Sequence, residues 1–424
     1  MSERGDIRGK IALVPAAEPS PHEYRSRDFT RFVSGRFLST LATQIQSVAI
    51  GWQIYDIQHT TLALGLVGLC QFLPMFLLTL PAGEVSDRLD QRRVLAGAQL
   101  AQATASALFL VFSLTRPHDV APFYLILVLF GAARGFAGPS GQSLLAFLVP
   151  PERLPRAIAL NSSAFTTAVI AGPALGGLLY ALGPAARYGV CCGAFLLASI
   201  LMGSLGGRRV AARRTDGTRF TRVVEGVRFV RDRRIILGAI SLDLFAVLFG
   251  GAAALLPAFA RDILHVGPIG LGLLRSAPAA GAACMALTLA RTPLQRRTGS
   301  RMFSAVALFG VATIVFGLST SVALSLAALF VVGAADMISV FVRSALIQYA
   351  TPDPMRGRVS AVNMLFIGAS NELGEFESGV TAAWLGTVPA VVVGGLGTLG
   401  VVLTWMWLFP GLRTVDRLTD AEAA

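Results

Sequence analysis

Residues 56–59 read Asp-Ile-Gln-His, and residues 262–265 read Asp-Ile-Leu-His, in a chain of 424 residues. Each tetrapeptide ends a long apolar stretch. Three further matches follow in the same order at a nearly constant offset: Gln91-Arg92-Arg93 with Gln295-Arg296-Arg297, Gly131-Ala132-Ala133-Arg134 with Gly333-Ala334-Ala335-Asp336, and Pro151-Glu152 with Pro352-Asp353. Ordered matches of this kind indicate an internal duplication, so the chain is predicted to consist of two related halves.

The apolar stretches define the fold class. The chain is 54% hydrophobic and only 14% charged, whereas about a quarter of a typical soluble protein is charged. About 20 apolar residues in a helix cross the roughly 30 Å of bilayer hydrocarbon, and a helix satisfies its own backbone hydrogen bonds there. We therefore predict an all-α membrane protein with 12 transmembrane helices in two pseudo-symmetric six-helix halves. The predicted spans are 31–55, 62–82, 93–115, 121–148, 157–181, 184–206, 235–260, 267–290, 301–320, 322–349, 358–385 and 387–410.

The basic residues predict the orientation, because cytoplasmic loops retain lysine and arginine. Of the 36 lysines and arginines, only Arg116, Arg187 and Arg261 fall in loops on the side opposite the termini. Both termini are therefore expected in the cytoplasm, with the chain in a bacterial inner (plasma) membrane. The net charge of +12 is then a topogenic signal and a contact for membrane lipid. Nucleic acid is not an expected partner.

Five segments are expected along the chain. They are a disordered cytoplasmic tail over 1–28, an N-terminal six-helix half over 29–206, a cytoplasmic central loop over 207–234, a C-terminal six-helix half over 235–411 and a cytoplasmic tail over 412–424. Apolar residues at helical spacing among the arginines of the central loop predict an amphipathic helix on the inner membrane surface. The dispersed histidines and cysteines predict no metal site and no cofactor. Without a hydrolase, kinase or P-loop motif, the chain is not expected to be an enzyme.

The loop after the second predicted span reads Gly-Glu-Val-Ser-Asp-Arg-Leu-Asp-Gln-Arg-Arg over residues 83–93. It resembles the signature loop of the major facilitator superfamily, in which a glycine and an Asp-Arg pair precede a basic cluster. The resemblance implies a cytoplasmic gate, held by an acid that bonds to arginines in one state. Asp90 stands where the family has a second glycine, and the second-half copy lacks the acid. The predicted gate residues are Gly83, Asp87, Arg88, Arg92 and Arg93.

The fifth predicted span contains Gly-Pro-Ala-Leu-Gly-Gly over residues 172–177, which resembles the Gly-Pro-x-x-Gly-Gly signature of antiporting facilitators. Its small residues permit close helix contact and its proline bends the helix. Segments 44–56, 152–162 and 370–376 look like the branch of the superfamily that includes the enterobactin exporter. The resemblance implies a monomer that exports a siderophore or drug-like small molecule in exchange for protons. The antiporter-like residues are Gly172, Pro173, Gly176 and Gly177.

Ionisable residues within the spans are costly and mark transport pathways. Arg134 and Asp336 occupy repeat-related positions of similar depth and opposite charge, so both are expected to face a cavity, with a buried structural pair as the alternative. Glu372 and Glu375 share a helix face, and in low dielectric one of them can hold a proton. The proton-coupling candidates are Asp243, Asp336, Glu372, Glu375 and Glu377. The cavity or substrate candidates are Arg36, Gln44, Trp52, Gln53 and Arg134.

The predicted function is secondary active transport by alternating access, with export coupled to inward proton flow. The absence of a nucleotide-binding P-loop favours this mechanism over one driven by ATP. Two alternatives remain open at this point. One is a multidrug or metabolite facilitator without proton coupling, and the other is a membrane sensor that binds a ligand without transporting it.

Overall fold

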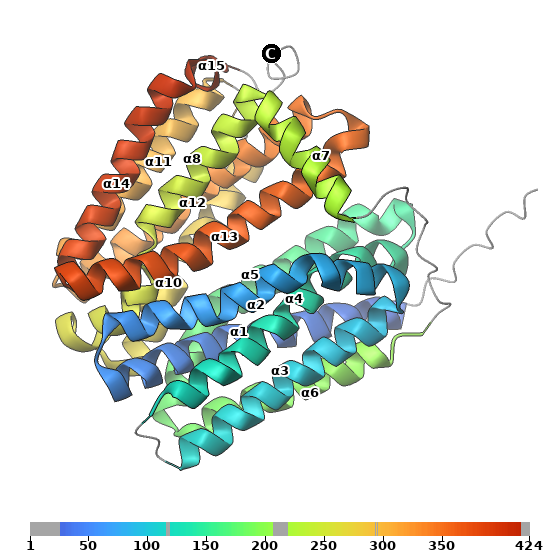
Figure 1. The fold of residues 1–424 in the computed structure, drawn as a ribbon, viewed down its shortest axis with the longest axis vertical. Coiled ribbons are helices and arrows are strands. Elements are labelled where there is room, and N and C mark those ends of the chain that lie inside the picture. Colours follow the sequence, from blue (N-terminus) through green and yellow to red (C-terminus); the bar gives the residue numbers. More distant parts are fainter. Residues whose placement is uncertain (1–25, 116–118, 207–218, 293, 295, 417–424) are drawn as a thin grey trace, which may run out of the picture.

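The computed structural model describes residues 26–115, 119–206, 219–292, 294 and 296–416. The described part is helical and contains no strand. Its helices form two bundles, one from each half of the sequence (Figure 1).

The N-terminal bundle contains six long helices. They are α1 (Ser26–Gln58), α2 (Thr61–Arg88), α3 (Gln91–Leu114), α4 (Ala121–Leu148), α5 (Leu154–Ala181) and α6 (Pro184–Gly203), with a short 3-10 turn η1 (Pro151–Arg153) before α5. Helix α1 packs against α5 and α6, α2 packs against α4, and α3 packs against α4 and α6. The core between them is built from aromatic and aliphatic side chains such as Phe109, Phe123, Tyr188 and Phe195.

The C-terminal bundle follows α7 (Arg219–Asp232), a short helix that packs on α8 and α13. Its elements are α8 (Arg234–Gly250), η2 (Ala252–Leu255), α9 (Leu256–Ala258), η3 (Phe259–Ile263), α10 (Gly267–Arg291), α11 (Thr298–Leu318), α12 (Val322–Ala350), α13 (Asp353–Leu385), α14 (Thr387–Leu408) and α15 (Pro410–Thr414). Helix α10 packs on α12, α11 packs on α12 and α14, and α8 packs on α13 and α14.

The span predicted over 235–260 is not one regular helix. Helix α8 ends at Gly250, and a 3-10 turn, a short α-turn and a π-helical turn continue the chain to Ile263. The freed carbonyl of Gly251 accepts a hydrogen bond of 2.9 Å from the Ser378 hydroxyl of α13. A neighbouring helix therefore satisfies the backbone group that the break exposes, as a membrane interior requires.

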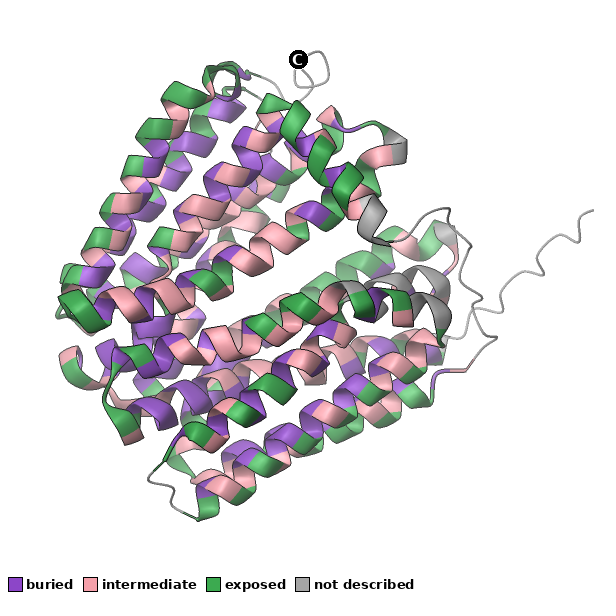
Figure 2. Cartoon of the chain, viewed as in Figure 1, coloured by how far each residue is buried: buried purple, intermediate pink, exposed green. Residues whose placement is uncertain are grey.

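Ten segments of the described chain are long and apolar enough to cross a membrane, counting Arg234–Ile263 as one. Helices α1 and α13, each of 33 residues, lie in the same bundles but contain more polar residues, so a count of twelve spans remains a prediction. Large apolar side chains point outward all round, among them Leu125, Leu403, Trp384 and Trp407, which are 70–83% exposed. Buried residues line the inner helix faces (Figure 2). This pattern is that of a multi-pass membrane protein, whose surface contacts lipid.

The two bundles meet through the helix pairs α2–α13 and α5–α10. In Figure 1 the helices of the two halves lie close at the end where α1 finishes and α10 begins, and they diverge toward the end that carries α7. We call these the closed end and the α7 end.

Two expected tails are shorter than predicted in the described part of the chain. Helix α1 begins at Ser26, and Asp28 within it is buried. At the other terminus, Leu412 and Val415 are buried, and the backbone N–H groups of Thr298 and Gly299 donate to the carbonyls of Asp416 and Val415. Residues 412–416 therefore pack on the start of α11, because they supply partners for its unpaired N–H groups.

Candidate transport pathway

A reciprocal pair of polar contacts joins the halves at the closed end. The Tyr55 hydroxyl at the end of α1 donates to Asp262 of η3, and Arg261 of η3 forms an ion pair with Asp56. Asp56 and Asp262 are the first residues of the repeated tetrapeptides, so each half contributes its aspartate to the other. His59 and His265, three residues later, both adopt left-handed backbone with φ of 53° and 52°. The repeat is therefore visible in backbone conformation and in contacts. We call the side chains of Tyr55, Asp56, Arg261 and Asp262 the end clamp.

Small residues bring α5 and α10 together below the end clamp. A Cβ atom on Gly177 would overlap the carbonyl oxygen of Pro268, and one on Gly272 would overlap that of Pro173. On the other face of α5, Gly176 lies against Ile45 of α1, where an added Cβ would come within 2.9 Å of the Ile45 carbonyl oxygen. The antiporter-like motif thus lies between its own bundle and the opposite one, and Gly172 likewise packs on Gln44 of α1.

An ion pair crosses between the halves at mid-length. Arg134 of α4 donates from Nη1 to Glu372 Oε1 of α13 at 3.1 Å and to Gln71 Oε1 of α2 at 3.3 Å. Glu375 lies one turn further along α13 and packs against Gly68 of α2. A Cβ atom added to Gly68 would lie 3.2 Å from Oε2 of Glu375. Asp336, the repeat counterpart of Arg134, lies instead inside the C-terminal bundle, so the alternative of a buried pair between these two residues is wrong.

Arg275 of α10 completes this mid-length group, which we call the cross-bundle charge group: Arg134, Arg275, Glu372 and Glu375. Arg275 donates to the Ser47 hydroxyl of α1, and both glutamates attract it electrostatically. Arg134 of this group comes from the N-terminal bundle, and Arg275, Glu372 and Glu375 come from the C-terminal bundle. Separation of the bundles would break the Arg134–Glu372 ion pair and the Arg275–Ser47 hydrogen bond, whereas Arg275 and the two glutamates would stay together in one bundle.

Two other candidates lie away from this group. Glu377 accepts a hydrogen bond of 2.7 Å from Thr381 of its own helix. Arg36 is half-buried and lies nearer the α7 end. Its guanidinium packs against Gly141 of α4, where a Cβ atom added to Gly141 would overlap Nη1 of Arg36.

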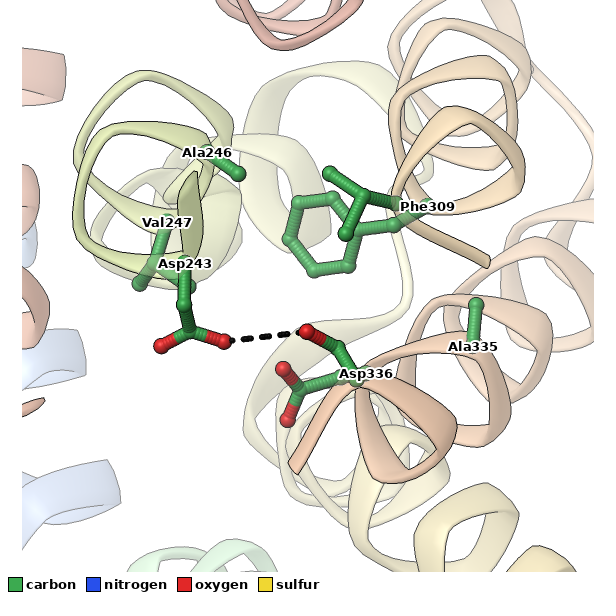
Figure 3. A pocket seen from close by; sticks show the side chains of 8 residues that line it. Asp243, Ala246, Val247, Phe309, Ala335 and Asp336 are labelled. Atoms are coloured by element: carbon green, nitrogen blue, oxygen red, sulfur yellow. Dashed lines mark hydrogen bonds between the residues drawn. The ribbon is translucent and has the colours of Figure 1, made fainter. Parts of the chain in front are cut away.

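A second charged site lies wholly inside the C-terminal bundle. Asp243 of α8 forms an ion pair with Arg343 of α12 and accepts a hydrogen bond of 3.3 Å from Ser339. Both side chains of the ion pair are almost fully buried, at 7% and 2% exposure. Asp336 lies one turn before Ser339, and it faces the same pocket as Asp243 (Figure 3).

The polar candidates of α1 are divided between two surroundings. Gln53 is buried inside the N-terminal bundle, where its Oε1 accepts hydrogen bonds from Ser113, Arg187 and Tyr188 at 2.8–3.1 Å. The structure therefore corrects its expected place in a cavity, and it also shows that Arg187, assigned above to a loop, is buried in α6. Trp52 is half-buried with its ring edge toward Tyr180 of α5, at 6.2 Å between centroids.

The predicted gate loop is only partly described. The side chains of Asp87 and Arg88 lie outside the described residues. Gly83 is buried, Arg93 is exposed, and Arg92 donates to the Leu205 carbonyl at 3.0 Å. Asp90, the departure from the family pattern, caps α3 by accepting the Arg92 N–H at 3.1 Å. Asp90 is therefore the N-cap of α3. Aspartate is favoured at an N-cap over glycine, which the family usually has at this position.

A profile of the transmembrane secretion effector family, a group of major facilitator transporters, matches residues 23–421. The chain belongs to this family.

Relatives of the chain include efflux transporters. The enterobactin exporter EntS of Citrobacter koseri is 26% identical over 383 residues, which cover 89% of this chain and 91% of that protein. The multidrug efflux pump Tap of Mycolicibacterium fortuitum is 27% identical over 388 residues, covering 88% of this chain and 93% of that protein. This family membership places the chain among transporters.

Solved structures share its fold. A peptide transporter POT in complex with sulfate superposes with a TM-score of 0.71 at 13% identity, covering 92% of this chain and 96% of that chain. A bacterial homolog of the lysosomal transporter Spinster, in an inward-facing and unoccupied conformation, gives a TM-score of 0.68 at 14% identity, covering 96% and 98%. At such identity the likeness establishes the major facilitator fold alone.

Proposed function

We propose that the protein is a secondary active exporter that exchanges a small molecule for protons by alternating access. The observation that carries this proposal is the Arg134–Glu372 ion pair, which joins α4 of one bundle to α13 of the other. An interaction made between two moving halves is present in one arrangement and broken in the other. It can therefore couple an event on Glu372 to the arrangement of the halves.

The direction of opening follows from the predicted orientation. If the termini and α7 are cytoplasmic, the closed end lies on the outer side of an inner membrane, and the bundles diverge toward the cytoplasm. The structure then corresponds to the state that receives an export substrate from inside the cell. The end clamp and the α5–α10 contact would have to open for release.

Proton coupling is assigned to the cross-bundle charge group. A proton on Glu372 or Glu375 removes a negative charge that faces Arg134 and Arg275. Arg134 then loses part of the attraction that holds α13 against the N-terminal bundle. Protonation would thus weaken the contact between the halves and deprotonation would restore it, so that the proton on the carboxylate and the arrangement of the halves are linked.

The substrate class follows the relatives, which export a siderophore or several drugs. We propose a siderophore or drug-like molecule as substrate and a monomer as the working unit. The alternatives of a facilitator and of a sensor make different predictions about proton movement.

Everted membrane vesicles with an acidic lumen test the proposal. Enterobactin and ethidium are added outside as probes, and probe uptake is recorded together with lumen pH. We expect uptake of at least one probe, with protons leaving the lumen in step. Uptake that ignores the pH gradient would favour the facilitator, and binding without uptake would favour the sensor.

A further inference from the structure

A cavity of about 260 Å³ lies within the C-terminal bundle, between α8, α11, α12 and α13. Its wall is mainly apolar and includes the aromatic rings of Phe309 and Phe316. Helix α13 contributes the polar groups of Ser370 and Asn371. All of its lining residues come from this one bundle, so the cavity belongs to a single half of the protein.

The charges in the lining leave one carboxylate uncompensated. Asp243 and Arg343 both reach the cavity, but they form an ion pair with each other. Asp336 also lines it, and within the part of the chain that the structure describes it has no hydrogen-bond or ion-pair partner. An unpaired carboxylate among apolar walls is costly, and it is stabilised by a proton or by a cation brought into contact with it.

The aromatic lining favours the cation of an organic molecule. Ring faces attract a positive charge, and they also bury an apolar body that a hydrated metal ion lacks. An anionic ligand would meet Asp336 without compensation, since Arg343 is already engaged by Asp243. The repeat-related position in the other half carries Arg134, which Glu372 engages in turn.

We infer that this cavity binds an organic cation with an apolar, aromatic body, whose positive charge contacts Asp336. This inference deepens the proposed export function and rests on it, because the cavity would be a substrate subsite. It places that subsite and the proton-coupling group on two faces of one helix. Ile367, Ser370 and Asn371 of α13 line the cavity, while Glu372 contacts Arg134 of the opposite bundle.

The test is equilibrium binding of radiolabelled methyltriphenylphosphonium to the purified full-length protein in detergent. Triphenylphosphine oxide, a neutral molecule of nearly the same shape, serves as competitor. We expect D336N to weaken phosphonium binding about tenfold or more, because it removes the only partner of the ligand charge. D336E should bind within a few-fold of the parent, and D232N, at an exposed site on α7, should bind unchanged.

The outcomes separate this inference from the function on which it rests. Equal binding by D336N and the parent protein, equal competition by the neutral phosphine oxide, or no phosphonium binding at all would overturn the cation subsite. If proton-linked uptake of enterobactin persists in any of these cases, the exporter proposal stands. If no probe moves and no proton movement occurs in the vesicle assay, the exporter proposal fails even where the phosphonium binds at Asp336.

Discussion

Arg261 forms an ion pair with Asp56, and Asp56 occupies the position in the first repeat that Asp262 occupies in the second. Asp262 in turn accepts the Tyr55 hydroxyl. The end clamp is therefore close to two-fold symmetric in its aspartates but not in their partners, because tyrosine precedes one and arginine precedes the other. A neutral hydrogen-bond donor and a cation thus both stabilise the contact between the halves at the closed end.

Tyr55→Phe should shift the protein toward the arrangement in which the closed end is open. The change removes one hydrogen bond to a carboxylate, and Asp262 is exposed and regains water. We expect a bias of about 1 kcal/mol, roughly fivefold in population. Spin labels at Thr60 and Ile269, on opposite halves of this end, report the change as a longer distance in double electron–electron resonance.

The matched control for this change is Tyr349→Phe, since Tyr349 is 48% exposed on α12. It should leave the distance distribution as in the parent. A Tyr55→Phe distribution that overlaps that of Tyr349→Phe would show that the end clamp does not hold the closed end.

Gly272→Ala should disfavour the closed arrangement without unfolding either bundle. The new methyl group would overlap the Pro173 carbonyl oxygen of the opposite bundle, and backbone atoms cannot rotate away as a side chain can. The same spin-label pair should report opening, and transport should slow. Gly189→Ala, where nothing lies within 4 Å of the added atom, is the control. If Gly272→Ala instead lowers the unfolding temperature while the distances stay unchanged, the contact is structural only.

The helices could be predicted from the sequence because lipid leaves a helix as the only arrangement for a long apolar stretch. Rotation of each helix about its axis could not be predicted. A span that is apolar on all sides carries little information about which face meets a neighbour. The sequence therefore predicts Gln53 in a cavity, although its side chain turns into its own bundle, and it gives no sign that Asp243 pairs with Arg343.

The end clamp and the break after Gly250 could not be predicted from the sequence, for different reasons. The repeated tetrapeptides indicate the duplication, and the polar side chains of Tyr55, Asp56, Arg261 and Asp262 suit contacts between the halves, but nothing in the sequence shows that the two loops meet. Glycine is frequent throughout these spans, so Gly250 and Gly251 did not mark a break. Asp90 departs from the family pattern, and its position directly before α3 indicates a helix cap.

Glu372→Arg should abolish proton-linked transport, because it places two cations across the contact between the bundles. The double variant Arg134→Glu with Glu372→Arg restores an opposite-charge pair at the same place. We expect it to recover part of the proton movement in everted vesicles, at least several-fold above the single variant. Asp232→Asn, at an exposed site on α7, is the control for expression and insertion. A double variant no better than Glu372→Arg alone would mean that the pair is not the coupling element.

Arg343→Met should be among the most destabilising single changes in the chain. It leaves Asp243 buried without its cation, which costs about 3–5 kcal/mol of unfolding free energy. Adding Asp243→Asn removes that uncompensated charge, so the double variant should regain most of the loss. The measurement is unfolding by sodium dodecyl sulfate in mixed micelles, with Arg301→Met at an exposed position as control. If the double variant unfolds as readily as Arg343→Met, the arginine stabilises the bundle through packing, and its charge pairing with Asp243 contributes little.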